Sequence, residues 1–360
     1  MASKKYAFTP DYAVKPGETL REVIETSDMT LRDFAARTGL TVQSIIRIIN
    51  GTQPITPDTA NRFELVTGTP ASLWNNLEKN YQEQLARIAE KERNAKDVEW
   101  LKLIPVNELV KRRIIRATKD RAEQVLEVLR FFAVGDVAAW HRIWDAPEVA
   151  TRRSSCFETC HGSAATWIRL GEIQAGRLAC QPYDKSKFKQ ALHEIRKLTS
   201  AEPSVFVPKL KEICAQCGVA LALVKELPKV PWFGASKWLS PEKAMILLNL
   251  RGKRDDLFWF AFFHEAGHVI NDNKKDLYIN SGDKTDPIEV RADEFAADML
   301  IPRKYESEIR MIRSKAEILQ IARKLEVSPG IVVGRYQHLT GKYKLFNDLK
   351  TRFSWSEQQS

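Results

Sequence analysis

Residues 257–268 read Leu-Phe-Trp-Phe-Ala-Phe-Phe-His-Glu-Ala-Gly-His, and this stretch carries the strongest signal in the chain. An apolar run is followed at once by two histidines four positions apart. Residues at this spacing lie on one face of an α-helix, so His264 and His268 can direct imidazole nitrogens at one point. The apolar run predicts that the helix is buried, and Gly267 permits close approach of a backbone or a ligand.

Two imidazoles on one helical face are typical of a zinc site. Glu265 stands beside them, where it can act as general base on a water molecule activated by zinc. Together the three residues form the HExxH arrangement of zinc peptidases. Because two histidines at this spacing also arise by chance, the interpretation requires a third ligand.

Glu289 is the expected third ligand, since a catalytic zinc site has three protein ligands and one open position. It opens a second amphipathic helical pattern that runs to Pro302. One turn later, Asp293 is placed to accept the second imidazole N–H of a ligand histidine and so to orient it. Two rival ligands, Glu294 and Asp298, fall on other faces of this helix.

Two strands are predicted ahead of the motif helix, at residues 219–224 and 244–250. The second is expected to be the edge strand to which an extended peptide substrate adds by main-chain hydrogen bonds. A purely structural sheet is the alternative. Three side chains remain open candidates for stabilising the oxyanion of the reaction: His338, Tyr278 and Arg335.

The N-terminal part shows two short helical patterns separated by a turn at Gly39. The first has an apolar stripe at residues 31–35, and the second covers residues 41–50. Two short helices joined in this way form a helix-turn-helix. Four apolar side chains of the second helix are expected to face inward: Val42, Ile45, Ile46 and Ile49.

Burial of that face would send Thr41, Gln43, Ser44 and Arg47 outward, towards the major groove of double-stranded DNA. Gln and Arg can pair bidentately with base edges, and Thr41 as N-cap leaves amide donors for a phosphate. Palindromic half-sites in an operator would call for a homodimer. An ordinary helical bundle with a polar face is the alternative.

The N-terminal residues resemble the Xre-type helix-turn-helix of HigA and VapI antitoxins over about residues 15–85. The segments that carry the resemblance are Lys15-Pro-Gly-Glu-Thr-Leu-Arg21, Met29-Thr-Leu-Arg-Asp-Phe-Ala35, Ile48-Ile-Asn-Gly51 and Pro54-Ile-Thr-Pro-Asp-Thr-Ala60. One departure is Leu31, where the family usually carries a Gln that supports a phosphate contact.

The C-terminal residues resemble the ImmA/IrrE family of zinc metallo-endopeptidases over about residues 200–355. The resemblance rests on His264 to His268, on Glu289-Val-Arg-Ala-Asp-Glu-Phe-Ala296 and on Met299-Leu-Ile-Pro302. It implies a zincin-like fold, a bound Zn²⁺ ion and cleavage of a peptide bond in a protein substrate, commonly a repressor.

Composition favours a globular protein of two or three domains, since 44% of the 360 residues are hydrophobic and 28% are charged. The net charge of +10 favours a polyanionic partner. We expect a cytoplasmic protein without a membrane segment, because the apolar run is far shorter than the ~20 residues of a bilayer span and the N-terminus lacks an apolar signal core.

The predicted fold class is mainly α with a small β-sheet (α+β). Residues 1–80 are expected to form a helix-turn-helix DNA-binding domain, residues 81–200 a helical linker or middle domain, and residues 201–360 a zincin-like metallopeptidase domain.

The preferred function is a DNA-binding transcriptional regulator, antitoxin-like, whose C-terminal domain cleaves a protein such as a repressor or a toxin-system partner. The first alternative is a non-catalytic HigA-like antitoxin or repressor, in which the zincin fold binds metal or a toxin. The second is a zinc protease whose N-terminal domain binds a protein instead of DNA.

Overall fold

A computed structural model describes residues 12–144, 155–274, 277–279 and 286–355. Contacts divide the chain into two compact units, Met1–Val98 with Thr118–Leu126, and Glu99–Ala117 with Glu127–Ser360. This division does not coincide with the predicted boundaries after residues 80 and 200. The helix at Ser155–Gly176, which precedes residue 200, packs on the sheet of the second unit and therefore belongs to that unit.

The first unit is a bundle of helices α1 (Pro16–Thr26), α2 (Leu31–Thr38), α3 (Val42–Ile49), α4 (Pro57–Thr67) and α5 (Ala71–Lys96). Local chemistry sets the helix ends: Thr30 and Asp33 form a capping box, and Gly39 ends α2 in the left-handed conformation. Gly17 lets α1 approach α3, because a Cβ there would lie 2.3 Å from the Ile49 Cα. The fully buried side chains of this core include Leu20, Phe34, Ile45, Phe63 and Trp74.

One prediction about α3 is wrong. Ile46 is 42% exposed, and Ile48, at 1%, takes the inward position instead. Positions i, i+3 and i+4 share one helical face, so Ile45, Ile48 and Ile49 form the buried stripe and Ile46 lies outside it.

The second unit is built on a four-stranded sheet with the order β1-β3-β2-β4. β1 (Val219–Leu223) runs parallel to β3 (Lys243–Leu248), and β2 (Gly234–Ser240) runs antiparallel to β3 and to the short β4 (Tyr278–Ile279). The prediction that the strand after residue 243 is an edge strand is therefore wrong, because β3 is paired on both sides. The strand between β3 and β4 is β2, which sequence patterning did not reveal.

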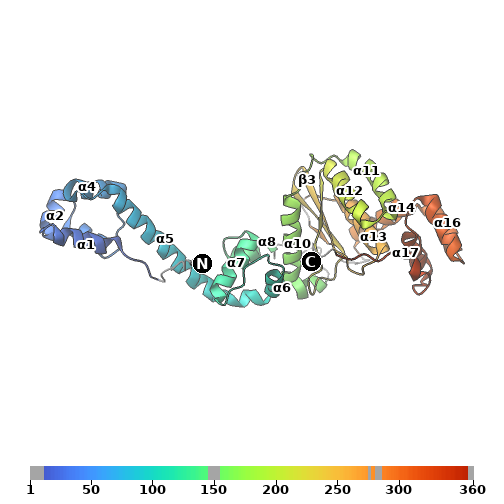
Figure 1. Cartoon of the computed structure of the whole chain (residues 1–360), viewed down its shortest axis with the longest axis horizontal. Coiled ribbons are helices and arrows are strands. Elements are labelled where there is room, and N and C mark those ends of the chain that lie inside the picture. Colours follow the sequence, from blue (N-terminus) through green and yellow to red (C-terminus); the bar gives the residue numbers. More distant parts are fainter. Residues whose placement is uncertain (1–11, 145–154, 275–276, 280–285, 356–360) are drawn as a thin grey trace, which may run out of the picture. The chain divides into compact units, whose positions relative to one another are not determined.

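Helices cover both faces of this sheet. Figure 1 shows α10 (Ser155–Gly176) on one side and α11 (Lys185–Lys197), α12 (Pro203–Gln216) and α13 (Asp255–Asn271) on the other. α14 (Pro287–Leu300) packs along α13. The remaining helices are η1 (Val98–Lys102), α6 (Val106–Lys111), α7 (Arg121–Phe132), α8 (Val137–Trp144), η2 (Leu198–Ser200), η3 (Arg303–Tyr305), α15 (Glu306–Arg310), α16 (Lys315–Leu325), α17 (Pro329–Thr340) and η4 (Asn347–Leu349).

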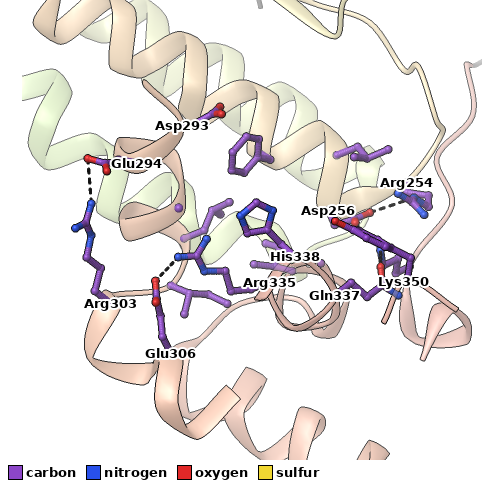
Figure 2. Close-up of a pocket in the computed structure, with 18 residues that line it drawn as sticks. Arg254, Asp256, Asp293, Glu294, Arg303, Glu306, Arg335, Gln337, His338 and Lys350 are labelled. Carbon is purple, nitrogen blue, oxygen red and sulfur yellow. Dashed lines mark hydrogen bonds and ion pairs between the residues drawn. The ribbon is translucent and has the colours of Figure 1, made fainter. Parts of the chain in front are cut away.

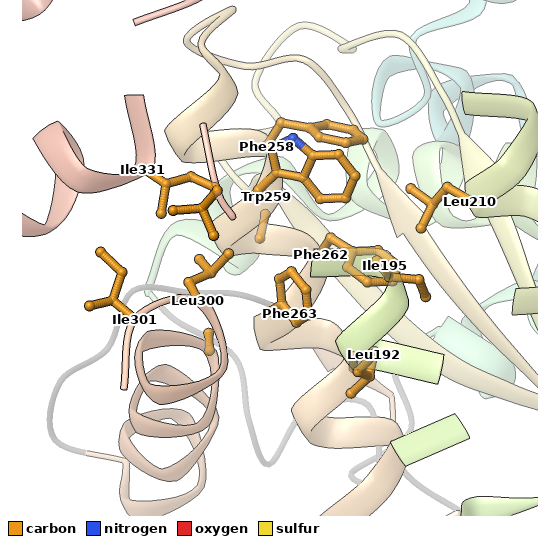
Figure 3. Close-up of a cluster of buried hydrophobic side chains, with 14 of the residues drawn as sticks. Leu192, Ile195, Leu210, Phe258, Trp259, Phe262, Phe263, Leu300, Ile301 and Ile331 are labelled. Carbon is orange, nitrogen blue, oxygen red and sulfur yellow. The ribbon is translucent and has the colours of Figure 1, made fainter. Parts of the chain in front are cut away.

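The apolar run at the start of α13 lies in the centre of this core. Trp259, Phe262 and Phe263 are fully buried and face side chains from α11, α12 and the end of α14 (Figure 3). Burial of three aromatic side chains stabilises the position of this helix by several kcal/mol in total, at roughly 1.5–3 kcal/mol each. The predicted burial of the motif helix is confirmed, and so is the α+β fold class. In the described part of the chain, no helix combines the length and the apolar character that a membrane crossing requires.

Candidate functional site

The candidate site lies where α13 meets α14. α13 carries His264, Glu265 and His268, which are 1%, 0% and 1% exposed, and α14 carries Glu289, which is 6% exposed. Gly267 keeps the two helices close, because a Cβ at that position would lie 3.1 Å from the Phe295 ring. The close packing brings the first turn of α14 to the histidine face of α13.

The three side chains present one ligand atom each to a common point. The two Nε2 atoms of His264 and His268 are 3.0 Å apart, and the Glu289 carboxylate oxygens lie 3.4 Å and 3.3 Å from them. Ligand atoms in tetrahedral directions, 2.0–2.1 Å from a zinc ion, are about 3.3 Å from one another. The spacing and the two-nitrogen, one-oxygen donor set therefore fit a zinc ion.

Carboxylates outside this cluster fix the orientation of both rings. Asp293 lies 2.8 Å from the Nδ1 atom of His264, and Asp272 lies 2.7 Å from the Nδ1 atom of His268. Each carboxylate accepts the Nδ1–H and so leaves Nε2 facing the ligand point. The sequence predicted Asp293 in this position but missed Asp272, which follows His268 by the same four-residue spacing that separates the histidines. Arg291 pairs with Asp272 in turn.

Glu265 points into a different environment. Its carboxylate is fully buried, and neither oxygen has a hydrogen-bond partner within the described residues. Gly234 of β2 makes room for it, because a Cβ there would lie 2.7 Å from the Glu265 Oε1 atom. Burial raises the pKa of Glu265 to about 7, against the lowering effect of the two histidines. A carboxylate with this pKa can both take up and return a proton near neutral pH.

Neighbouring carboxylates raise the pKa values of both histidines. Burial alone would lower the pKa of His264, but Asp293 and Glu289 raise it to about 10. The pKa of His268 is also raised, by Asp272 and Glu289 against the effect of burial. Burial by itself would raise the pKa of Glu289, yet the histidines hold it at about 2.

Zinc binding should therefore release protons at neutral pH, because zinc takes the neutral imidazole of each ring. Zinc affinity should rise with pH up to the raised pKa values of the rings. Isothermal titration calorimetry in two buffers of different ionisation enthalpy measures the proton count. Identical apparent enthalpies in both buffers would contradict the expected release.

The three oxyanion candidates are placed differently. The Tyr278 ring stacks on His268, with centroids 4.6 Å apart, and its hydroxyl accepts a hydrogen bond from the Asn273 backbone N–H at 2.9 Å. His338 and Arg335 line a cavity beside the site. Tyr278 is thus held against His268, whereas the other two belong to the wall of that cavity (Figure 2).

The predicted DNA-reading residues lie on the outward side of α3. Thr41 caps the helix, and its hydroxyl accepts from the Ser44 backbone N–H at 3.0 Å. Gln43 and Arg47 are exposed, and Ser44 is half-buried. Residues 1–80 contain nine basic and nine acidic side chains, so the positive charge of the chain lies elsewhere. DNA binding by this unit would therefore depend on the local placement of its arginines.

Comparison with known families identifies both ends of the chain. Residues 224–337 match the model of the IrrE N-terminal-like domain, peptidase family M78. Residues 20–74 match the model of the helix-turn-helix. The two resemblances inferred from the sequence are thereby confirmed.

Three similar proteins each match about a fifth to a quarter of the chain. YddM, an uncharacterized HTH-type transcriptional regulator of Escherichia coli K12, is 27% identical over 64 residues, which are 18% of this chain and 68% of YddM. A putative antidote protein of a plasmid maintenance system from Nostoc punctiforme is 30% identical, over 23% of this chain and 92% of that one, with a TM-score of 0.23. Pseudomonas aeruginosa antitoxin HigA, solved with the higBA promoter, is 27% identical over 24% of this chain and 92% of that chain, with a TM-score of 0.22.

Proposed function

We propose that this chain, which carries a helix-turn-helix domain of the DNA-binding transcriptional-regulator type and a peptidase M78 domain, is a zinc-dependent endopeptidase that also binds operator DNA. His264, His268 and Glu289 are the proposed zinc ligands, and Asp293 orients one of them. The substrate is the backbone of another protein, such as a repressor or a toxin-system partner.

The mutual spacing of the three ligand atoms is the observation that carries the enzymatic half. The described residues contain this one group of at least three metal-ligating side chains that could hold an ion. All three groups are buried, and each histidine is oriented by its own carboxylate. Such a site supports a metal-binding role better than a chance pair of histidines would.

A zinc ion held by these ligands would supply Lewis acidity towards water and the scissile carbonyl. Glu265 is the proposed general base and acid. It takes a proton from the attacking water as the new C–O bond forms at the carbonyl carbon. It then returns that proton to the amide nitrogen as the C–N bond breaks, so that the products are a carboxylic acid and an amine.

The DNA-binding half rests on the exposed face of α3. Thr41, Gln43, Ser44 and Arg47 are the proposed contacts with a double-stranded operator, with Gln43 and Arg47 reading base edges. A homodimer would match the two halves of a palindromic site.

Metal analysis of purified full-length variants tests the proposed ligands. The wild-type chain should bind about one zinc per chain, and His264→Ala and Glu289→Ala should each bind far less, because a three-ligand site loses one donor. Glu294→Ala is the matched control, since Glu294 lies on the same helix but pairs with Arg303 on the surface. Equal zinc content in Glu289→Ala and wild type would contradict the proposed third ligand.

A further inference from the structure

Helix α3 presents one large apolar side chain among the polar side chains of its exposed face. Within α3 and its C-cap, the exposed residues are Gln43, Ile46, Arg47 and Asn50. Their spacing of i, i+3, i+4 and i+7 places them on one side of the helix, away from the buried stripe. Ile46 is 42% exposed. An isoleucine thus lies between the two residues proposed to contact base edges.

A second exposed apolar side chain adjoins Ile46. Leu31, at the start of α2, is 37% exposed, and both residues line a hollow of about 270 Å³ together with Met29. A single exposed isoleucine is ordinary at a protein surface, whereas adjoining apolar side chains at a binding face favour a contact there. The hydrogen bonds proposed for Gln43 and Arg47 do not involve Ile46, so its exposed surface requires its own explanation.

The surroundings of Ile46 favour DNA over a protein as the partner. Within the part of the chain that the structure describes, the side chains of Gln43, Arg47 and Asn50 have no hydrogen-bond or ion-pair partner. A protein that covered Ile46 would also have to supply partners for these three groups. The major groove offers donors and acceptors at every base pair, and it offers isolated methyl groups among them.

Thymine is the base that fits an apolar side chain on this face. Its C5-methyl group is the apolar feature of the base edges in the major groove. Side chains at i and i+3 are about 5–6 Å apart at Cβ, and neighbouring base pairs are about 3.4 Å apart along the duplex. Ile46 therefore reaches a base pair one or two steps from the one that Gln43 contacts, where it would remove a thymine methyl group from water.

We propose that Ile46 is a specificity-determining residue of the DNA-binding unit and that it recognises the C5-methyl group of a thymine in the operator. The inference rests on the proposed binding of operator DNA, and it adds an apolar contact to the hydrogen bonds of Gln43 and Arg47. Because the contact involves no charge, the preference for thymine should not change with salt concentration, unlike the overall affinity.

The experiment measures fluorescence anisotropy of the full-length chain on an operator selected from random double-stranded DNA. Each thymine is replaced in turn by deoxyuridine, which lacks the C5-methyl group and keeps the hydrogen-bonding groups. Replacement of one thymine in each half-site should weaken binding about fourfold, the effect of one buried methyl-sized group. Ile46→Ala should bind the thymine operator about tenfold more weakly, and it should bind the thymine and deoxyuridine operators equally.

Leu65→Ala is the matched control, because it removes a side chain of the same size from another exposed position of this unit. Leu65 lies on α4, is 86% exposed and is not part of the lining of the hollow. This variant should keep the wild-type affinity and the preference for thymine. Ile46→Val, which retains most of the apolar surface, should keep part of that preference. Circular dichroism establishes that each variant is folded.

The same fourfold preference for thymine in Ile46→Ala as in the wild-type chain would overturn the proposal. So would an operator in which no deoxyuridine replacement weakens binding. An unchanged preference combined with altered sedimentation of Ile46→Ala would assign the apolar surface of Leu31 and Ile46 to a protein contact. If no operator were selected, the DNA-binding half of the proposed function would fail and the role of Ile46 with it, whereas binding without sensitivity to the methyl group would reject the role of Ile46 alone.

Discussion

Glu265→Gln is expected to reduce the rate of peptide cleavage by about 10²–10⁴-fold, the usual contribution of a general base. The amide has nearly the shape of the carboxylate but cannot take up the proton of the attacking water. Glu265 is not among the proposed zinc ligands, so zinc should stay bound at about the wild-type level. The initial rate of cleavage of a pool of fluorescence-quenched peptides, measured beside zinc content, tests both expectations.

Glu194→Gln serves as the control, because it makes the same chemical change at an exposed position of α11, away from the lining of the cavity. Cleavage by Glu265→Gln at the wild-type rate would remove Glu265 from the mechanism. If the wild-type chain, fully loaded with zinc, cut neither the peptides, itself nor a co-encoded partner, the non-catalytic alternative would replace the enzyme. The zincin fold would then bind metal or a toxin, and the helix-turn-helix would act as a repressor.

Combined replacement of Gln43 and Arg47 by Ala is expected to weaken specific DNA binding by about 10²-fold or more, since each bidentate base contact contributes about 1–3 kcal/mol of discrimination. An operator selected from random double-stranded DNA provides the probe, and fluorescence anisotropy at two salt concentrations provides the affinity. The wild-type affinity should fall as salt rises.

Arg87→Ala is the matched control for charge. Arg87 is exposed on α5 of the same unit, away from the α3 face, so its loss should change affinity little. Unchanged binding in the double variant would remove α3 from the interface. If no sequence were selected from the random pool at all, the N-terminal unit would instead be a protein-binding module.

Sequence reasoning succeeded where chemistry depends on helical spacing. The positions of His264, His268 and Asp293 follow from the 3.6-residue period, once α13 and α14 are known to meet. Ile46 shows the limit of the same reasoning, because four isoleucines in five positions leave the phase of the helix ambiguous. Only the structure shows, through the burial of Ile48, which face of α3 is turned towards the core.

Features that depend on contacts between distant segments could not be predicted. β2 contains Gly, Ser, Lys and Trp, and it lacks the regular alternation that marks a strand, so only its pairing with β3 and β4 reveals it. Without β2, the sequence pattern places β3 at the edge of the sheet. The cavity likewise combines α13 and α14 with α17, which begins 29 residues after the end of α14. No local pattern indicates that these helices enclose a space.

An ion bound at the candidate metal centre would also stabilise the contact between the two helices that hold it. Two donors come from α13 and the third from α14, so one ion would cross-link two helices that are otherwise held by packing around Gly267 and by the polar contacts of Asp293 and Arg291. Ligand binding to the native state stabilises it by about 2.7 kcal/mol at a free concentration one hundred times Kd. The free energy of unfolding of this domain would therefore rise with the zinc concentration. Removal of zinc would lower the stability of the domain as well as abolish its proposed activity.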